Sequence, residues 1–130
     1  MKLCMIGTGY VGLVTGACFA DLGNDVICVD KQKDKISYLK NGKIPIYEPG
    51  LEDLVIKNYK AKRLNFTNDL GSAVRKSNLV FICVGTPSKK NSNAADLSQI
   101  YNVTKEVSKY INKFKIIITK STVPVTTGDE

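Results

Sequence analysis

A cluster of glycines near the N-terminus limits the possible folds of this chain more than any other feature. Gly7, Gly9 and Gly12 form a G-x-G-x-x-G pattern that directly follows an apolar segment and opens a helical pattern. The first glycine permits a tight turn, the second lets the backbone approach a pyrophosphate, and the third lets the helix lie close to the strand. The pattern predicts a strand, a phosphate-binding loop and a helix whose N-terminus faces the anion.

An acidic residue closes the second predicted strand. Asp30 lies 18 residues after Gly12, where a carboxylate can accept hydrogen bonds from both hydroxyl groups of a ribose. The carboxylate repels a 2′-phosphate and therefore favours NAD over NADP, although Lys31, Lys33 and Lys35 are cations that can attract such a phosphate. Three alternatives stay open: the glycines can form a purely structural strand-to-helix turn, Asp30 can be an ordinary strand-terminating Asp, and the loop can be that of an S-adenosylmethionine enzyme. The complete glycine pattern disfavours the last of these.

Apolar segments and helical patterns alternate along the whole chain. Strands are predicted over residues 2–6, 25–30, 64–67, 79–84 and 115–119, and helices over residues 10–22, 34–41, 51–59, 70–76 and 97–110. Such alternation is typical of βαβ units. We therefore predict an α/β fold, a doubly wound parallel sheet of the Rossmann type with strand order 3-2-1-4-5. Ligands of such sheets bind at the carboxyl ends of the strands.

Charge and composition exclude several classes of function. The 130 residues include 19 Lys and Arg against 12 Asp and Glu, and no His. The positive charges are scattered rather than gathered in a stripe with aromatic residues, so we expect no nucleic-acid partner. Because no apolar run is long enough to span a bilayer and no leader pattern follows Met1, we also expect no membrane partner and a cytoplasmic location.

The cysteines carry no metal-binding pattern. Cys4, Cys18, Cys28 and Cys83 are widely spaced, and apolar residues flank each of them. We therefore expect four reduced thiols in the core and no metal site. The absence of His also removes the commonest general base, so we expect no hydrolytic triad in this chain.

Four motifs, taken in order, resemble those of the UDP-glucose/GDP-mannose dehydrogenase family. They are GTGYVGLVTG at residues 7–16, PIYEPGL at residues 45–51, VGTPS at residues 84–88 and KSTVPV at residues 120–125. The resemblance runs along the whole chain, and the second and fourth motifs are the most specific. It implies that residues 1–130 are an NAD-binding domain that ends before a central helix and a substrate-binding domain.

The resemblance implies a role for each matched residue. The glycine loop would hold the pyrophosphate of NAD, Asp30 would bind the adenosine ribose, and Lys35 would lie near the adenosine end. Residues 84–88 would border the adenosine and ribose side, and Ser121 and Thr122 would approach the nicotinamide half. The implied cofactor-binding residues are Gly7, Thr8, Gly9, Tyr10, Val11, Gly12, Asp30, Lys35, Val84, Gly85, Thr86, Pro87, Ser121 and Thr122. Thr122 is also the implied catalytic residue, because the family uses this hydroxyl to order the active-site water. Its alternative is a turn hydroxyl before Pro124.

The segment at residues 45–51 has two interpretations. It can shape the mouth of the site, or it can simply be a turn and a helix start, with Pro49 and Glu48 favourable near the first turn. We favour the second interpretation and leave the segment out of the predicted site. Thr126 stands where the family usually has Gly, and a Thr resists the positive φ that Gly accepts.

Members of this family oxidise the C6 alcohol of a nucleotide sugar in two NAD-dependent steps, through a thioester on a Cys in a later domain. The resemblance implies the N-terminal portion of an enzyme that converts UDP-glucose to UDP-glucuronate with two NAD. GDP-mannose or UDP-N-acetylmannosamine are alternative substrates, and a stand-alone nucleotide-sensing module is the alternative from another class. Because the glycine-flanked Cys motif of the family does not occur here, we expect the fragment alone to be inactive. We expect the full-length protein to be a homodimer or a larger oligomer that contacts its sugar mainly through other domains.

Overall fold

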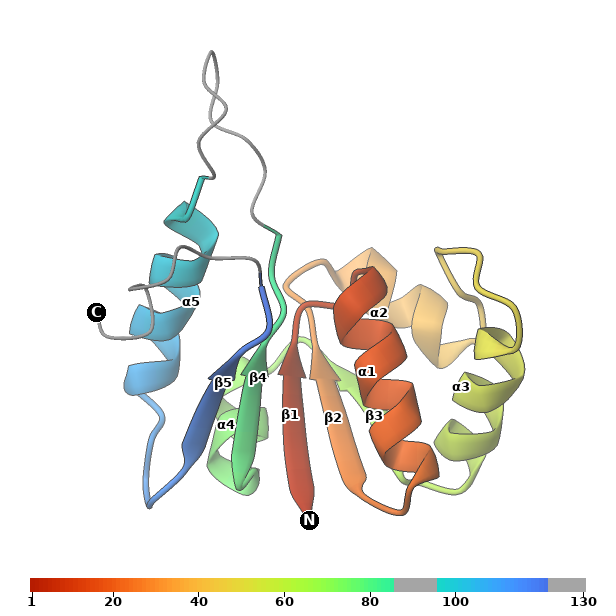
Figure 1. Ribbon diagram of the computed structural model, residues 1–130, viewed down its shortest axis with the longest axis horizontal. Helices are drawn as coiled ribbons and strands as arrows, with labels where there is room; N and C mark the ends of the chain where they lie inside the picture. The colour runs from red at the N-terminus through yellow and green to blue at the C-terminus, as the bar shows by residue number, and fades with distance from the viewer. Residues whose placement is uncertain (86–95, 122–130) are drawn as a thin grey trace.

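The computed structural model of the chain describes residues 1–85 and 96–121, and these residues form a parallel sheet with helices on both faces (Figure 1). The strands are β1 (Lys2–Ile6), β2 (Asp25–Val29), β3 (Leu64–Thr67), β4 (Leu79–Ile82) and β5 (Ile116–Thr119). The helices are α1 (Tyr10–Asp21), α2 (Lys33–Lys40), α3 (Leu51–Lys60), α4 (Leu70–Lys76) and α5 (Ser98–Ser108).

The sheet has the order β3-β2-β1-β4-β5, and all its neighbouring strands are parallel. Strand β1 pairs with β2 on one side and with β4 on the other, so Met5 lies opposite Cys28 and also opposite Phe81. The doubly wound sheet and the strand order that the sequence predicts are therefore confirmed. The chain reverses its direction of winding between β1 and β4, and a ligand crevice is expected at the carboxyl ends of these two strands.

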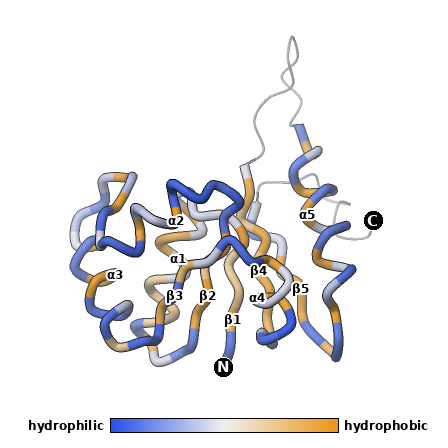
Figure 2. Tube along the Cα trace, turned by 180° about the vertical axis from the view of Figure 1, so that it is seen from behind, coloured by the Kyte–Doolittle hydropathy of each residue, from blue (hydrophilic) through white to orange (hydrophobic). Residues whose placement is uncertain are grey.

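The two faces of the sheet carry two separate apolar clusters, because neighbouring residues of a strand point to opposite faces. On one face Met5 and Cys28 pack in a cluster with residues of α1, α2 and α3. On the other face Cys4 and Val80 pack with Ala73 and Val74 of α4 and with α5. Figure 1 shows α1 in front of the sheet and α4 behind it, and Figure 2 shows the same layers from behind with the strands mainly in orange shades.

Helix α1 lies close to the sheet because small residues line its inner side. Gly16 and Ala17 are buried in this helix together with Leu13 and Ala20. A Cβ at Gly16 would come within 2.9 Å of the Cys28 sulfur, so a larger residue would push the helix away from β2. The small residues therefore fix how far the N-terminus of α1 lies from the ends of the strands.

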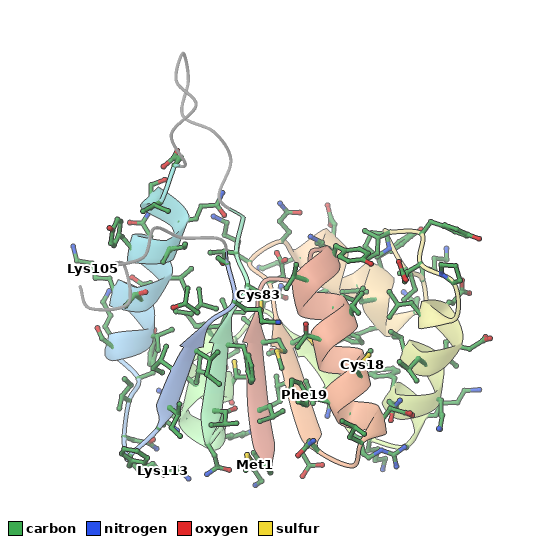
Figure 3. The ribbon with its side chains drawn as sticks, viewed as in Figure 1. Met1, Cys18, Phe19, Cys83, Lys105 and Lys113 are labelled. Carbon is green, nitrogen blue, oxygen red and sulfur yellow. The ribbon has the colours of Figure 1, made fainter. Side chains whose placement is uncertain are left out.

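The prediction for Cys18 is wrong, because this residue is exposed whereas Cys4, Cys28 and Cys83 are buried as expected. The buried positions of α1 recur every three or four residues, as one face of a helix requires. Cys18 follows Ala17 by about 100° around the axis and leaves that face. Figure 3 shows Cys18 on α1 and Cys83 near the upper ends of the central strands.

Small differences from the predicted boundaries occur at two strand ends that matter for the site. Strand β2 ends at Val29 and β4 at Ile82, so Asp30 and Val84 both lie just beyond the sheet. The backbone N–H of Asp30 still donates to the Thr67 carbonyl at 3.2 Å. This last hydrogen bond of the sheet places Asp30 at the carboxyl end of β2.

Candidate functional site

Position 7 requires a glycine for two reasons, its backbone angle and the atoms close to it. Gly7 has a φ of +104°, a region that side-chain-bearing residues rarely adopt. Its N–H donates to the Val29 carbonyl at 2.8 Å, and a Cβ added here would come within 2.8 Å of the Cys83 carbonyl oxygen. The loop therefore turns directly against the ends of β2 and β4.

The other two glycines of the motif serve different purposes. A Cβ at Gly12 would come within 1.9 Å of the Gly7 carbonyl oxygen, so only a glycine lets the first turn of α1 rest on the loop. A Cβ at Gly9 would meet no atom within 4 Å. The conformation of Gly9 is also extended, with a φ of −74°. Gly9 is thus not required by the packing of the described residues, and it leaves space beside the N-terminus of the helix.

The N-terminus of α1 offers unpaired donors. Gly9 is the N-cap, and its carbonyl accepts the first helical hydrogen bond from the Leu13 N–H. No side chain of the described residues caps this end, and the first turn of α1 holds no acidic residue. The N–H groups of Tyr10 and Val11 and the positive end of the helix dipole are therefore available to an anion.

Asp30 lies next to this loop, and several donors hold its carboxylate. The Thr8 hydroxyl donates to Oδ2 at 2.7 Å and the Thr8 N–H to the same atom at 3.2 Å. The Gln32 N–H donates to Oδ1 at 3.0 Å, and the Lys35 ammonium lies 3.6 Å from Oδ2. Partial burial favours the neutral acid, but the hydrogen bonds from Gln32 and Thr8, with the Lys35 charge, outweigh it and hold the pKa of Asp30 below its ordinary value. The carboxylate is ionised at neutral pH.

A second segment reaches the loop from residues 44–50. The Tyr10 hydroxyl donates to Glu48 Oε2 at 2.9 Å, and this bond and the Glu48 charge raise the pKa of Tyr10 above its ordinary value. Residues 44–50, with Glu52 and Asp53, line an open pocket of about 620 Å³. The predicted site omits Glu48. Because the motif at residues 45–51 is specific to the family that the sequence resembles, it could have indicated that Glu48 lies near the site.

The residues that directly follow β4 and β5 also lie beside the glycine loop. A Cβ at Gly7 would come within 3.3 Å of the Val84 nitrogen, which places Val84 beside the glycine loop. The Ser121 hydroxyl donates to the Val84 carbonyl at 2.7 Å. Gly85 follows and is exposed. The ends of β1, β4 and β5 are thus brought together, as the sequence predicts.

Three residues of the predicted site, Thr86, Pro87 and Thr122, lie outside the described residues. Among residues 1–85 and 96–121, no group of three or more His, Cys, Asp or Glu side chains is arranged to hold a metal ion. No helix of the same residues has the length and apolar character needed to cross a membrane.

The thiol nearest to the loop is not activated. A Cβ at Gly12 would come within 3.2 Å of the Cys83 Cβ, so Cys83 lies directly below the glycine loop. Burial raises the pKa of Cys83 to about 11, although the Lys120 charge lowers it slightly. Burial likewise raises the pKa of Cys4 to about 12, with a further increase from Cys83. These thiols are neutral at pH 7 and serve packing rather than nucleophilic attack.

Comparisons with known proteins agree with this geometry. Residues 1–130 match the sequence model of the NAD binding domain of the UDP-glucose/GDP-mannose dehydrogenase family. The chain is 58% identical over 130 residues to a UDP-glucose 6-dehydrogenase of Rhizobium meliloti (strain 1021), covering 100% of this chain and 30% of that protein. It is 54% identical to the UDP-glucose 6-dehydrogenase TuaD of Bacillus subtilis (strain 168), covering 98% of this chain and 27% of that protein.

Solved structures of dehydrogenases have the same fold as this chain. The chain superimposes with a TM-score of 0.95 on a ternary complex of a Pseudomonas aeruginosa GDP-mannose dehydrogenase, at 40% identity and over 100% of this chain and 30% of that one. A UDP-glucose dehydrogenase of Pyrobaculum islandicum gives a TM-score of 0.91 at 35% identity, over 97% of this chain and 30% of that one. The chain thus spans about 30% of the length of the relatives it matches.

The contrast between two glycines gives a test of the loop geometry. We expect Gly12→Ala to lower the free energy of unfolding by about 3 kcal/mol, because its Cβ would overlap the Gly7 carbonyl oxygen. Gly9→Ala is the matched control. Its free energy of unfolding should lie within about 0.5 kcal/mol of that of the natural chain, since its Cβ meets open space. Urea titration followed by circular dichroism measures both. Equal destabilisation by the two changes would contradict the packing described here.

Proposed function

We propose that this chain is part of an enzyme that oxidises UDP-glucose to UDP-glucuronate with two NAD. The chain belongs to the UDP-glucose/GDP-mannose dehydrogenase family and forms its NAD-binding domain. The proposed binding of NAD rests on one observation, an ionised Asp30 carboxylate held beside an uncapped helix N-terminus. The substrate part is supported by the relatives that match the whole chain at 58% and 54% identity, because both are UDP-glucose 6-dehydrogenases. GDP-mannose and UDP-N-acetylmannosamine are the alternative substrates, and a solved GDP-mannose dehydrogenase is 40% identical.

The residues of the site fit the parts of NAD. The free N–H groups at the start of α1 suit a pyrophosphate, and the open space at Gly9 allows it to approach the backbone. We assign the adenosine ribose to Asp30 and the adenosine end to Lys35, because a carboxylate accepts from ribose hydroxyls and repels a 2′-phosphate. Bound NAD supplies the hydride acceptor of the reaction.

On the other side of the loop, we assign Val84 and Gly85 to the border of the cofactor and Ser121 to its nicotinamide half. The hydrogen bond between the Ser121 hydroxyl and the Val84 carbonyl ties these two ends together. This bond supports a rigid wall beside the glycine loop. On the resemblance described above, we also assign Thr86, Pro87 and Thr122, which lie outside the described residues, to cofactor binding.

We propose that the catalytic nucleophile is not among these 130 residues. Cys4, Cys28 and Cys83 are buried, and burial raises the pKa of each thiol. Cys18 is exposed, but it lies nine residues along α1 from Gly9, about 13 Å down the helix. The whole protein would then take its nucleophile and most of its sugar contacts from other segments, and we propose that it is a homodimer or a larger oligomer.

The state of the cysteines bears on location. All four thiols are free, as is usual for proteins of a reducing compartment. We therefore propose a cytoplasmic location.

The first test of the proposed function concerns Asp30. We expect Asp30→Ala to weaken NAD binding about 10- to 150-fold, because hydrogen bonds to a charged acceptor are lost. NADP binding should fall less or improve, because the carboxylate that repels the 2′-phosphate is gone. Calorimetry with both cofactors measures the difference. Asp34→Ala is the control, since Asp34 is an exposed carboxylate of the neighbouring helix, and equal losses for the two cofactors in Asp30→Ala would rule out the ribose contact.

The second test concerns the nucleophile. A polypeptide of the printed 130 residues should bind NAD but produce no NADH with UDP-glucose, because its buried thiols stay protonated. Absorbance at the NADH band, against a blank without polypeptide, measures this. A Cys18→Ser variant checks that the exposed thiol does not contribute. Turnover that survives removal of contaminating enzyme would show that these residues are sufficient for catalysis.

The third test concerns Thr122, which lies outside the described residues. A Thr hydroxyl is too weak a base to take the alcohol proton itself, so we propose that it holds a water or an oxyanion by hydrogen bonding. In the whole enzyme, Thr122→Ala should lower kcat about 100-fold and leave NAD affinity nearly unchanged. Steady-state kinetics and calorimetry measure the two quantities. An unchanged kcat with a lower unfolding temperature would instead mean that Thr122 is a turn residue before Pro124.

A further inference from the structure

Thr8 occupies an unexpected position in the glycine loop. It lies between Gly7 and Gly9, in the part of the loop assigned to the pyrophosphate, yet its side chain is fully buried. The hydroxyl and the backbone N–H of Thr8 both donate to one atom, Oδ2 of Asp30, at 2.7 and 3.2 Å. Thr8 therefore faces another side chain of the site rather than the space that a cofactor would occupy.

The backbone of Asp30 is fixed by its neighbours in the sheet. Its N–H donates to the Thr67 carbonyl at 3.2 Å, and its own carbonyl accepts from the Asn68 side-chain amide at 3.0 Å. The side chain of Asp30 is only 12% exposed. The remaining freedom of the residue is therefore the rotation of its carboxylate, which is the part that Thr8 controls.

The hydrogen bonds from Thr8 leave only part of the Asp30 carboxylate free to accept from a ligand. A carboxylate oxygen accepts about two hydrogen bonds, and the two donors of Thr8 already occupy both acceptor positions of Oδ2. The Gln32 N–H uses one lone pair of Oδ1. Lys35 lies 3.6 Å from Oδ2 and contributes charge rather than a hydrogen bond. The acceptor that remains for a ligand is thus on Oδ1.

We propose that Thr8 is a positioning residue that sets the preference for NAD: it holds Oδ2 of Asp30 so that Oδ1 receives a ribose hydroxyl and a 2′-phosphate is repelled. This inference rests on the proposed ribose role of Asp30 and adds a residue that acts through it. The hydrogen bonds from Thr8 also lower the pKa of Asp30 and keep its negative charge. The interpretation of Thr8 as a direct cofactor ligand does not account for a buried hydroxyl that already has a partner.

Four variants of the whole protein test the proposal by calorimetry with NAD and with NADP. They are Thr8→Val, Thr8→Ser, Asp30→Asn and the double variant Thr8→Val with Asp30→Asn. Val has the shape of Thr without the hydroxyl, and we expect it to weaken NAD binding about tenfold while NADP changes less. Ser keeps the donor and should restore NAD binding to within about twofold of the natural residue.

The double variant separates positioning from direct contact. If Thr8 acts through Asp30, Thr8→Val should cause no further loss of NAD affinity once Asp30 is Asn. The same loss in both backgrounds would mean that Thr8 touches the cofactor itself, and it would overturn the proposal. An unchanged NAD affinity with a lower unfolding temperature in Thr8→Val would also overturn it, because the role would then be structural only.

The outcome for Asp30→Asn distinguishes this inference from the function on which it rests. A loss of NAD affinity in Asp30→Asn without one in Thr8→Val rejects the role of Thr8 and leaves the ribose contact in place. An unchanged NAD affinity in Asp30→Asn rejects the ribose contact and with it the inference. If Val at position 8 prevents folding, Thr8→Ala removes the hydroxyl without adding volume, and the same results are expected for it.

Discussion

The contact between the backbone at Gly7 and the first turn of α1 determines the rest of the site. A Cβ at Gly12 would come within 1.9 Å of the Gly7 carbonyl oxygen, so the end of the strand and the start of the helix approach too closely for a side chain between them. Gly7 also turns against β4, where an added Cβ would come within 2.8 Å of the Cys83 carbonyl oxygen, so the loop is packed between the end of β4 and the first turn of α1. Packing of the glycine loop therefore places the N-terminus of α1 next to the carboxyl ends of the central strands (Figure 1).

The two charges that the site offers have different physical origins. The positive end at α1 comes from backbone N–H groups, so no cationic side chain has to be desolvated there. The negative charge is a real carboxylate on a side chain that is only 12% exposed, and such burial is unfavourable unless donors compensate for it. Thr8, Gln32 and Lys35 supply that compensation at Asp30. The site therefore offers adjacent groups of opposite sign, as the proposed contacts with a pyrophosphate and a ribose require.

The sequence predicts the sheet and its strand order because both depend on short-range patterns. Buried strands such as Leu79–Ile82 read as apolar runs, and the glycine pattern determines the turn between β1 and α1. The direction of the Thr8 side chain depends on the positive φ of Gly7 and could not be read from the pattern. The exposure of Cys18 was missed for a related reason, since apolar neighbours in sequence do not fix the buried face of a helix that carries apolar residues on all its sides.

The bond between Tyr10 and Glu48 joins residues 38 positions apart, and it explains why a tyrosine suits the start of α1. Ile44 and Ile46 pack against the main apolar cluster, which brings the following residues towards the helix. A carboxylate in place of Tyr10 would repel Glu48 and oppose the positive end of the α1 dipole. The neutral hydroxyl of Tyr10 instead donates to Glu48, so the segment at residues 44–50 is tied to the loop without an acidic side chain in the first turn of α1.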